Sequence, residues 1–420
     1  MIRYRQTLLV LLFTMMAGVA VAQNNTNSPY TRYGYGQLAD QGSGNSKAMG
    51  GVAYGLRDKY QVNFANPASY TAVDSLTFIF DGGVSLQNTN LSDGKLKRNA
   101  KNSSVDYVTM MFRLHPKCAM SLGLLPYSNV GYNMNETQEN EEVTTSSSNV
   151  NYYGEGGLHQ LYIGLGYKVW SNFSIGANVS YLWGDMTHGV AQTFPNSSSI
   201  MPWSKTTNLD ITSYKLDFGA QYTHRFDKKH ALTVGVVFSP GHDVSNEAYT
   251  AVTLGNSTTG YTSSQKDTVV TCGIPTTFGV GATYTYNERL TVGMDVMFQN
   301  WSSTAFMSNK EAFTNRTRVS VGAEYLPNPQ GRSYLSHVKY RVGAFYNKPY
   351  YKIDGVDAAK EYGVSMGFGL PVLRSRSVLS LSAQYVRTEG AKSNFLTENT
   401  FRICVGVTFN ERWFFKRTVD

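Results

Sequence analysis

The residue types that most often carry chemistry are scattered along this chain of 420 residues. None of its seven histidines has an acidic residue or a cysteine at a spacing typical of metal ligands. Cys118, Cys272 and Cys404 also lack such spacing, and an odd number of cysteines cannot form a complete disulfide framework. We find no nucleophile elbow, Walker loop or dinucleotide fingerprint. The sequence therefore predicts no catalytic residue, metal site, cofactor or nucleic-acid partner, and we do not expect an enzyme.

Two other arrangements stay open as minor alternatives. Serine and threonine are so abundant that His159 or His188 could pair with one of them, as in hydrolases at the rim of a membrane barrel. The acidic run 136–142, which contains Glu139, Glu141 and Glu142, could bind a divalent cation. A histidine at the surface or in the lumen, and a solvated acidic loop, are the favoured interpretations.

The N-terminus has the three parts of a secretory signal peptide. Arg3 and Arg5 precede an apolar stretch that begins at Leu8, and Ala20-Val21-Ala22 forms a small-x-small cleavage site. We therefore expect residues 1–22 to be removed after export. After this segment no apolar run approaches the roughly 20 residues that a transmembrane helix needs.

The remaining chain is rich in strand formers that alternate with period two. It contains 29 Tyr, 21 Phe and 39 Gly, and only 16% of its residues are charged. In 173–183 apolar and aromatic residues occupy one face, and small polar residues occupy the other. Segments 290–298 and 401–409 repeat this pattern, which is typical of strands that face lipid on one side.

The opposite face and the connections favour a membrane barrel over a β-sandwich. The inward positions include charged residues, which suit a wet lumen. They are Lys215, Asp217, Asp295, Glu324, Lys339, Arg341 and Arg402. Short turns, such as 115–117 and 170–172, alternate with long polar loops. We expect these loops at 133–156, 185–209, 241–272, 299–314 and 347–360. Short periplasmic turns and long outer loops are characteristic of outer-membrane barrels.

The fold class that follows is all-β, a transmembrane antiparallel β-barrel of about 14 strands. We predict the strands at 75–88, 104–114, 118–132, 157–169, 172–185, 210–226, 230–240, 273–286, 289–299, 315–326, 336–347, 361–371, 377–388 and 399–410. The barrel then occupies residues 75–420. It lies in the outer membrane of a Gram-negative cell, in contact with lipids and lipopolysaccharide, and we expect a monomer.

Residues 23–74 precede the first strand and do not read as wall strands. They are rich in glycine, asparagine and serine, and their aromatic residues follow no sustained period. Because disordered tails are poor in aromatic residues, we favour a plug, or hatch, inside the lumen. A barrel of 14 strands is wide enough to need one.

The third predicted strand contains a proline, Pro126, where a closed sheet should not have one. Proline has no N–H to donate to a neighbouring strand. We therefore expect the pairing to be interrupted at Pro126, Tyr127, Ser128 and Asn129, although an ordinary bulge or rim position would also explain the residue.

Several motifs resemble the FadL/TodX family of hydrophobic-compound transporters, of which the chain would be a divergent, Bacteroidetes-like member. Ala48-Met49-Gly50-Gly51, followed by Asn66-Pro67-Ala68, resembles the N-terminal hatch of that family. Ile274 to Gly281 resembles its proline-containing entry into a strand, and Asp295 to Ser302 resembles a tryptophan-serine strand end. Together with the strand count, these motifs cover most of the mature chain.

The resemblance implies a mechanism. A hydrophobic ligand, such as a long-chain fatty acid, would enter from outside and leave sideways through a gap in the third strand. The hatch, with Asn66, Pro67, Ala68, Gly50 and Gly51, would gate this passage. The alternative is a non-transporting barrel of the same architecture that binds a protein partner or secretion cargo. The sequence does not identify ligand-binding residues.

Overall fold

Pairing between the first and the last wall strand closes an antiparallel barrel. The computed structural model describes residues 26–75, 77–94, 97–139, 147–196, 200–256, 260–353, 355–357, 359–372, 376–390 and 395–412. The last strand, β19 (Thr397–Arg412), pairs with the first, β2 (Thr77–Ser92), along its whole length. The predicted signal peptide lies outside the described residues.

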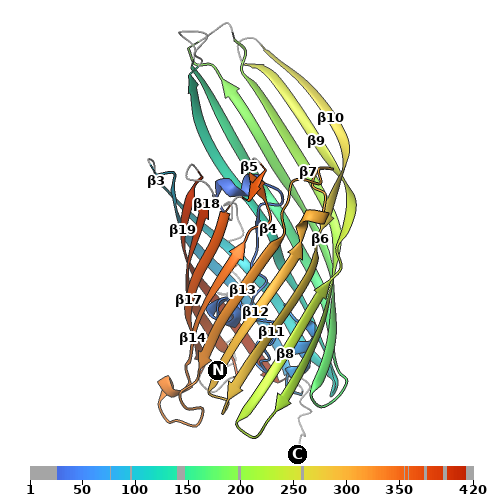
Figure 1. The fold of residues 1–420 in the computed structure, drawn as a ribbon, viewed down its shortest axis with the longest axis vertical. Helices are drawn as coiled ribbons and strands as arrows, with labels where there is room; N and C mark the ends of the chain where they lie inside the picture. The colour runs from blue at the N-terminus through green and yellow to red at the C-terminus, as the bar shows by residue number, and fades with distance from the viewer. Residues whose placement is uncertain are drawn as a thin grey trace, which may run out of the picture.

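The other wall strands follow one another around the barrel in chain order (Figure 1). They are β3 (Lys97–His115), β4 (Cys118–Glu139), β5 (Ser147–Lys168), β6 (Phe173–Thr193), β7 (Trp203–Arg225), β8 (His230–Ser239), β9 (His242–Asn256), β10 (Gly260–Ile274), β11 (Thr276–Tyr286), β12 (Leu290–Asn300), β13 (Arg316–Tyr325), β14 (Lys339–Lys348), β17 (Ala359–Pro371) and β18 (Val378–Gly390).

Two of the wall strands are interrupted by a proline. β7 pairs with β8 in its lower half and with β9 in its upper half, so β8 and β9 form one strand that bends at Pro240. In the same way β10 continues into β11 across Pro275. The sixteen assigned strands of the described wall therefore make fourteen wall strands, which confirms the predicted count.

Side chains alternate between the two faces of the wall as predicted. In β6, Val179 and Tyr181 are exposed on the outside, whereas Asn178 and Ser180 are buried inside. Apolar side chains face outward because lipid covers this side, and polar ones face inward to a filled lumen. No helix in the described part of the chain is long and apolar enough to cross a membrane.

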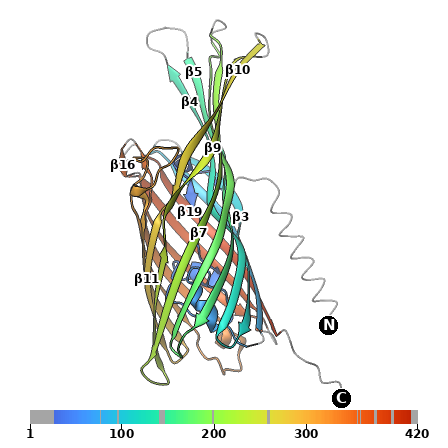
Figure 2. The same cartoon turned by 90° about the vertical axis from the view of Figure 1, so that its right-hand side faces the viewer.

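Three of the predicted loops are wrong. Residues 133–156, 185–209 and 241–272 belong mostly to β4–β7, β9 and β10, which continue far above the rest of the rim (Figures 1 and 2). These upper strand ends stand in water and lack the apolar alternation of a lipid-facing wall, so they resemble loops in sequence. Hydrogen bonds between side chains of neighbouring strands help to hold them, for example between Thr187 of β6 and Asn208 of β7 at 3.0 Å.

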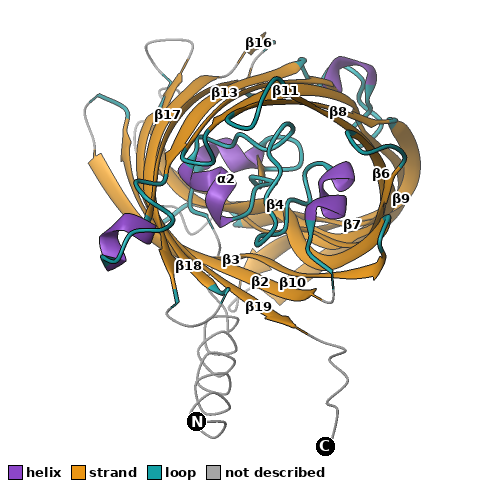
Figure 3. Cartoon of the chain, turned by 90° about the horizontal axis from the view of Figure 1, so that it is seen from below, coloured by secondary structure: helices purple, strands orange, loops and turns teal. Residues whose placement is uncertain are grey.

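The segment before the wall lies inside the barrel (Figure 3). Its elements are η1 (Pro29–Arg32), β1 (Gln37–Leu38), α2 (Gly44–Ala48) and η2 (Pro67–Ala72). Nearly all of its side chains are buried or half-buried. We call the described residues 26–74 the interior segment. The remaining short elements are η3 (Trp301–Ser303), η4 (Tyr334–His337), β15 (Lys352–Ile353) and β16 (Val356–Asp357).

Candidate functional site

The pairing between β3 and β4 stops partway along both strands. The uppermost paired residues are Val108 in β3 and Leu124 in β4. Above this level the described pairs join β3 to β2, and β4 to β5. We call this loss of pairing, between residues 97–107 of β3 and 125–139 of β4, the β3–β4 break.

The interior segment pairs with β4 at the β3–β4 break. Gln37 and Leu38 form the short strand β1, and they lie opposite Asn129 and Ser128 in antiparallel register. β4 thus gains a neighbour from inside the barrel on the side where β3 has left it. An unpaired strand edge inside a membrane is costly because its N–H and C=O groups lack partners.

The next residues of the interior segment continue this cover. The backbone N–H of Ala39 donates to the carbonyl of Tyr127 at 2.9 Å. The side-chain amide of Gln41 donates to the carbonyl of Pro126 at 3.1 Å. On the side that β3 has left, the backbone carbonyls of Pro126 and Tyr127 therefore have partners from the interior segment.

Pro126 does not break β4 itself. Its pairing with β5 continues on both sides, with a register shift between Pro126 and Ser128. Tyr127 and Ser128 are buried, and Pro126 and Asn129 are half-buried. The four residues predicted from the proline thus lie together just above the last β3–β4 pair, at a bulge that accommodates the missing N–H.

Asn66-Pro67-Ala68 starts η2 on another part of the wall. The side-chain oxygen of Asn66 accepts from the N–H of Ala68 at 3.1 Å and caps η2, while its amide donates to the carbonyl of Tyr54 at 2.8 Å. The motif packs against wall glycines: a Cβ at Gly219 would lie 2.2 Å from the Asn66 oxygen. Only glycine allows this approach.

Gly50 and Gly51 contact a third part of the wall. Both have a positive φ, of 70° and 97°, which favours glycine. The N–H of Gly50 donates to Ser365 of β17 at 2.9 Å, and a Cβ on Gly50 would lie 2.7 Å from the carbonyl oxygen of Ala344. Here the interior segment touches the wall backbone directly.

The residues predicted as hatch and as opening are therefore not neighbours. The Asn-Pro-Ala segment contacts β5–β7, the glycine pair contacts β13, β14 and β17, and residues 126–129 contact residues 37–41. Gln37, Leu38, Ala39 and Gln41 carry no motif or periodicity, so sequence reasoning missed them. Their position follows from the three-dimensional path of the chain alone.

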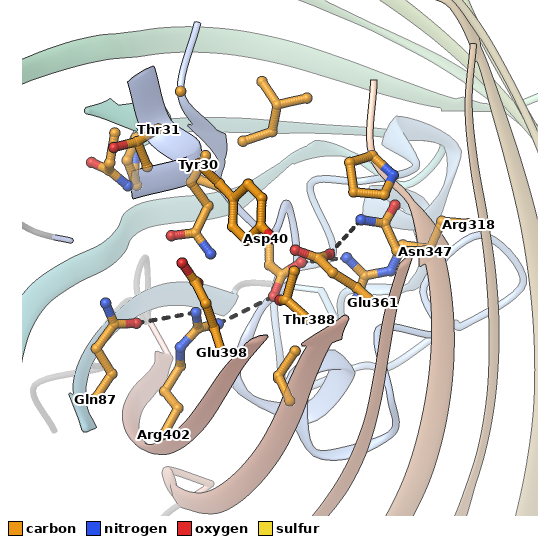
Figure 4. A pocket seen from close by; sticks show the side chains of 18 of the residues that line it. Tyr30, Thr31, Asp40, Gln87, Arg318, Asn347, Glu361, Thr388, Glu398 and Arg402 are labelled. Atoms are coloured by element: carbon orange, nitrogen blue, oxygen red, sulfur yellow. Dashed lines mark hydrogen bonds and ion pairs between the residues drawn. The ribbon is translucent and has the colours of Figure 1, made fainter. Parts of the chain in front are cut away.

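A polar cavity lies between the interior segment and the β3–β4 break. It is lined by Ser104 and Asp106 of β3, by Pro126 and Asn129 of β4, and by residues 36–40. Charged side chains of β13, β17 and β19 complete its lining (Figure 4). Because the cavity touches both strands that flank the break, it is the internal space behind it.

Ion pairs tie the interior segment to the wall across this cavity. Asp40 pairs with Arg318 of β13 and, at 3.4 Å, with Arg402 of β19 (Figure 4). Lys47 pairs with Asp106 at 2.7 Å. Burial alone would raise the pKa of Asp40, but the two guanidinium groups hold it well below its ordinary value. The carboxylate is therefore charged at neutral pH and fixes the segment to two separate strands.

A cluster of aromatic side chains lies beside the cavity. The rings of Trp301 and Tyr350 lie 4.4 Å apart, and those of Trp301 and Phe313 lie 5.3 Å apart. Tyr35 of the interior segment packs on the same cluster, and its hydroxyl donates to the carbonyl of Gly273 at 2.9 Å. The interior segment is thus packed against two outer loops at this end of the barrel.

The two histidines singled out in the sequence contact aromatic side chains in the structure, and Glu141 and Glu142 of the acidic run lie outside the described residues. His188 contacts the hydroxyl of Tyr132 at 2.9 Å, and His159 packs near Trp183. His242 contacts Ser213 at 3.1 Å, and its ring stacks on Tyr214. Among the described residues there is no group of three or more His, Cys, Asp or Glu side chains that could hold a metal ion.

A closed antiparallel barrel with an apolar outer band and an internal N-terminal segment defines an outer-membrane protein of the FadL/TodX fold. The chain itself belongs to the BamG family, whose model matches residues 1–420. No curated protein matches the chain.

Solved structures of this fold superpose on nearly the whole chain. A Pseudomonas aeruginosa FadL homologue has a TM-score of 0.61 at 15% identity, and covers 90% of this chain and 99% of its own. The Pseudomonas putida toluene transporter TodX has a TM-score of 0.59 at 16% identity, with 90% and 100% covered. The CymD monoaromatic hydrocarbon channel gives 0.60 at 13%, with 90% and 98% covered. These neighbours are channels and transporters rather than enzymes, and at such identities the likeness concerns the fold.

Proposed function

We propose that the chain transports a hydrophobic small molecule across the outer membrane and releases it sideways through the β3–β4 break. The observation that carries this proposal is the end of wall pairing at Val108 and Leu124, with the interior segment covering β4 above it. An apolar ligand gains roughly 0.8 kcal/mol per CH₂ group that stays out of water. A route that opens into lipid therefore favours it more than a wet pore does.

The cavity behind the break refines the class of ligand. It is lined by Asp40, Lys47, Asp106, Arg318 and Arg402, which an apolar molecule would not stabilise. A long-chain amphiphile that resembles a fatty acid fits both the charged cavity and the bilayer beyond the break. Its polar head would face the charged cavity, and its chain would pass between β3 and β4 into the bilayer.

The interior segment is the moving part in this proposal. Residues 23–74 act as the hatch of a barrel formed by 75–420, after removal of the signal peptide 1–22 and export through the periplasm. Release of β1 from β4 opens the passage, while Asn66-Pro67-Ala68 and Gly50-Gly51 anchor the segment to the wall. The barrel functions as a monomer among outer-membrane lipids and lipopolysaccharide.

Uptake into liposomes tests the proposal. The purified full-length chain is reconstituted, and entry of radiolabelled oleate, toluene and glucose is measured against protein-free liposomes. We expect faster entry of oleate, no change for glucose, and loss of oleate entry when β1 is linked covalently to β4. Equal oleate entry with and without protein, repeated across a panel of hydrophobic compounds, would overturn it.

A second candidate function is a non-transporting barrel that binds a protein partner. The upper ends of β4–β7, β9 and β10 favour it, because they rise beyond the rim as a single sheet exposed to solvent (Figure 2). Transport through the wall needs no such sheet. Copurification in mild detergent separates the two functions: a stoichiometric protein without bound lipid supports the second.

A further inference from the structure

The strand ends above the rim form a sheet with two different faces. We call these ends the outer sheet: β4 131–139, β5 147–155, β6 185–193, β7 203–210, β9 247–256 and β10 260–269. Met186, Leu209 and Ala248 are buried on its inner face, which continues the lumen side of the wall. Because side chains alternate along a strand, their neighbours Asp185, Asp210 and Glu247 point outward.

The outward face carries a row of carboxylates in direct register. Asp185 of β6 lies opposite Asp210 of β7, and Asp210 lies opposite Glu247 of β9. Glu155 and Asp267 lie one row farther up, on the two flanking strands of the same face. All five side chains are exposed. Like charges opposite one another destabilise a sheet, so this row lowers the stability of the isolated protein.

No lysine or arginine in the described part of the outer sheet lies on the face of this row, where the nearest titratable partner is His159 of β5, which interacts with Asp185. By strand alternation, the two lysines of the outer sheet, Lys205 and Lys266, belong to the inner face, together with His188. The whole chain nevertheless has a net charge of +8, so the acidic face does not reflect its composition. Lysine and arginine are available in the chain but are absent from this surface among the described residues.

The acidic row lies just above the lipid-facing band. In β6 the exposed apolar side chains run from Ile175 to Tyr181, and in β7 they run from Tyr222 up to Tyr214. Asp185 and Asp210 come four residues beyond the ends of these bands, on the same strands. The row is therefore accessible from outside the cell, at the level where an extracellular protein would meet the barrel.

We propose that the outward face of the outer sheet is the docking surface for a protein with a basic surface. A basic partner would offset the repulsion between carboxylates that face one another in the isolated protein. Complementary charge also speeds and orients the association of two proteins. Tyr153 and Tyr249 lie on the same face, and aromatic side chains are common in the centres of such interfaces. This inference rests on the second candidate function and names its surface.

The experiment compares two double variants of the full-length chain in detergent. One is Asp210→Asn with Glu247→Gln. The other is Glu136→Gln with Glu311→Gln, which removes the same charge from two exposed positions off this face, one on the inner face of the outer sheet and one in an outer loop. A fluorescent decalysine peptide is the probe, and decaglutamate is its control. Heat-modifiable migration in gels confirms that each variant is folded.

We expect the first variant to bind decalysine about tenfold more weakly than the wild type, and the second to bind it unchanged. Binding should also fall in about 0.5 M NaCl, because salt screens exposed charges. Equal loss in both variants would overturn the proposal, since binding would then follow net charge alone. Calcium that competes with the peptide would indicate that the carboxylate row binds ions. Together with the absence of a protein adduct in the crosslinking experiment below, this result would also overturn the proposal.

A photo-crosslinking amino acid at Thr187, in the centre of this face, identifies the partner in the cells that make the protein. We expect one discrete adduct that is lost in the Asp210→Asn/Glu247→Gln variant. The control position is Lys101, exposed on β3 at another part of the rim. An adduct at Lys101 alone would overturn the surface but leave the partner-binding function standing. No adduct at either position would overturn both.

Discussion

Leu38 of the interior segment lies opposite Ser128 of β4, at a level where β4 has lost its wall neighbour β3. A strand from inside the lumen thus takes the place of a strand of the wall. Two paired residues make a small contact, and the ion pairs of Asp40 lie immediately after it in the chain. The interior segment therefore covers the β3–β4 break through a short contact with β4, and ion pairs with the distant strands β13 and β19 hold it there.

A disulfide between Leu38→Cys and Ser128→Cys should stop oleate entry into liposomes. The two positions face one another in the β1–β4 pair, so the bond would hold the segment against the break. Reduction should restore entry. The control is Thr285→Cys with Thr291→Cys, a facing pair between β11 and β12. Unchanged entry with the first bond formed would contradict release through this break.

Gly50→Ala should loosen the interior segment without opening the barrel wall. A Cβ here meets the backbone of Ala344, and φ is 70°, so the change combines strain with a clash. Limited proteolysis should cut the segment faster, while the gel mobility of the folded barrel stays the same. Gly355→Ala is the matched control because its φ is 75° and nothing lies within 4 Å. Similar effects of both changes would show that only local strain matters.

Asp40→Asn should release the segment from β13 and β19. Removing one partner of a largely buried charge network typically costs about 3 kcal/mol. Acid should act in the same direction: the lowered pKa of Asp40 stabilises the folded state above the unfolded pKa of about 3.9, and this contribution is lost as pH falls below it. Proteolysis of the segment at pH 7 and pH 3 measures both effects. If the rate of proteolysis changes equally with pH in the wild type and in the variant, Asp40 does not cause the acid effect.

Two substitutions at Asn66 separate its roles. Asn66→Asp keeps the oxygen that caps η2 but loses the amide donated to Tyr54, whereas Asn66→Ala loses both. Loss of the cap should cost about 1 kcal/mol. Hydrogen exchange of residues 66–72 should therefore be fastest in the alanine variant and intermediate in the aspartate variant. Equal protection in all three proteins would contradict the capping role.

The sequence predicts the wall well because lipid imposes a simple rule on it. In 173–183 every second side chain is apolar, and similar stripes mark many of the other wall strands, so the count of fourteen was predictable. The rule stops at the membrane surface. Residues 185–193 and 203–210 continue as strands in water, where serine, threonine and asparagine serve as well as apolar residues. These strand ends were therefore mistaken for loops.

The site was predictable only where a residue is chemically unusual. Pro126 marks a position beside the β3–β4 break because a missing N–H has a local effect on pairing. Gly50 and Gly51 can be singled out in the sequence because glycine is common where the backbone has a positive φ. Leu38 and Gln41 have no such signal, since their contacts to β4 depend on how the interior segment crosses the lumen. Nor does a sequence motif reveal that Asp40 joins two strands far apart in the chain.

The closure of the barrel between β2 and β19 has a consequence for the order of folding. This pairing joins the first wall strand to the last, the largest separation of neighbouring wall strands in the chain. At several wall glycines the backbone of the interior segment lies so close that a Cβ would not fit between them. Residues 26–74 precede every wall strand in the chain, so the content of the lumen is synthesised before the wall that encloses it. The strand β2 is made first among the wall strands and finds its partner β19 only when the whole wall has been made.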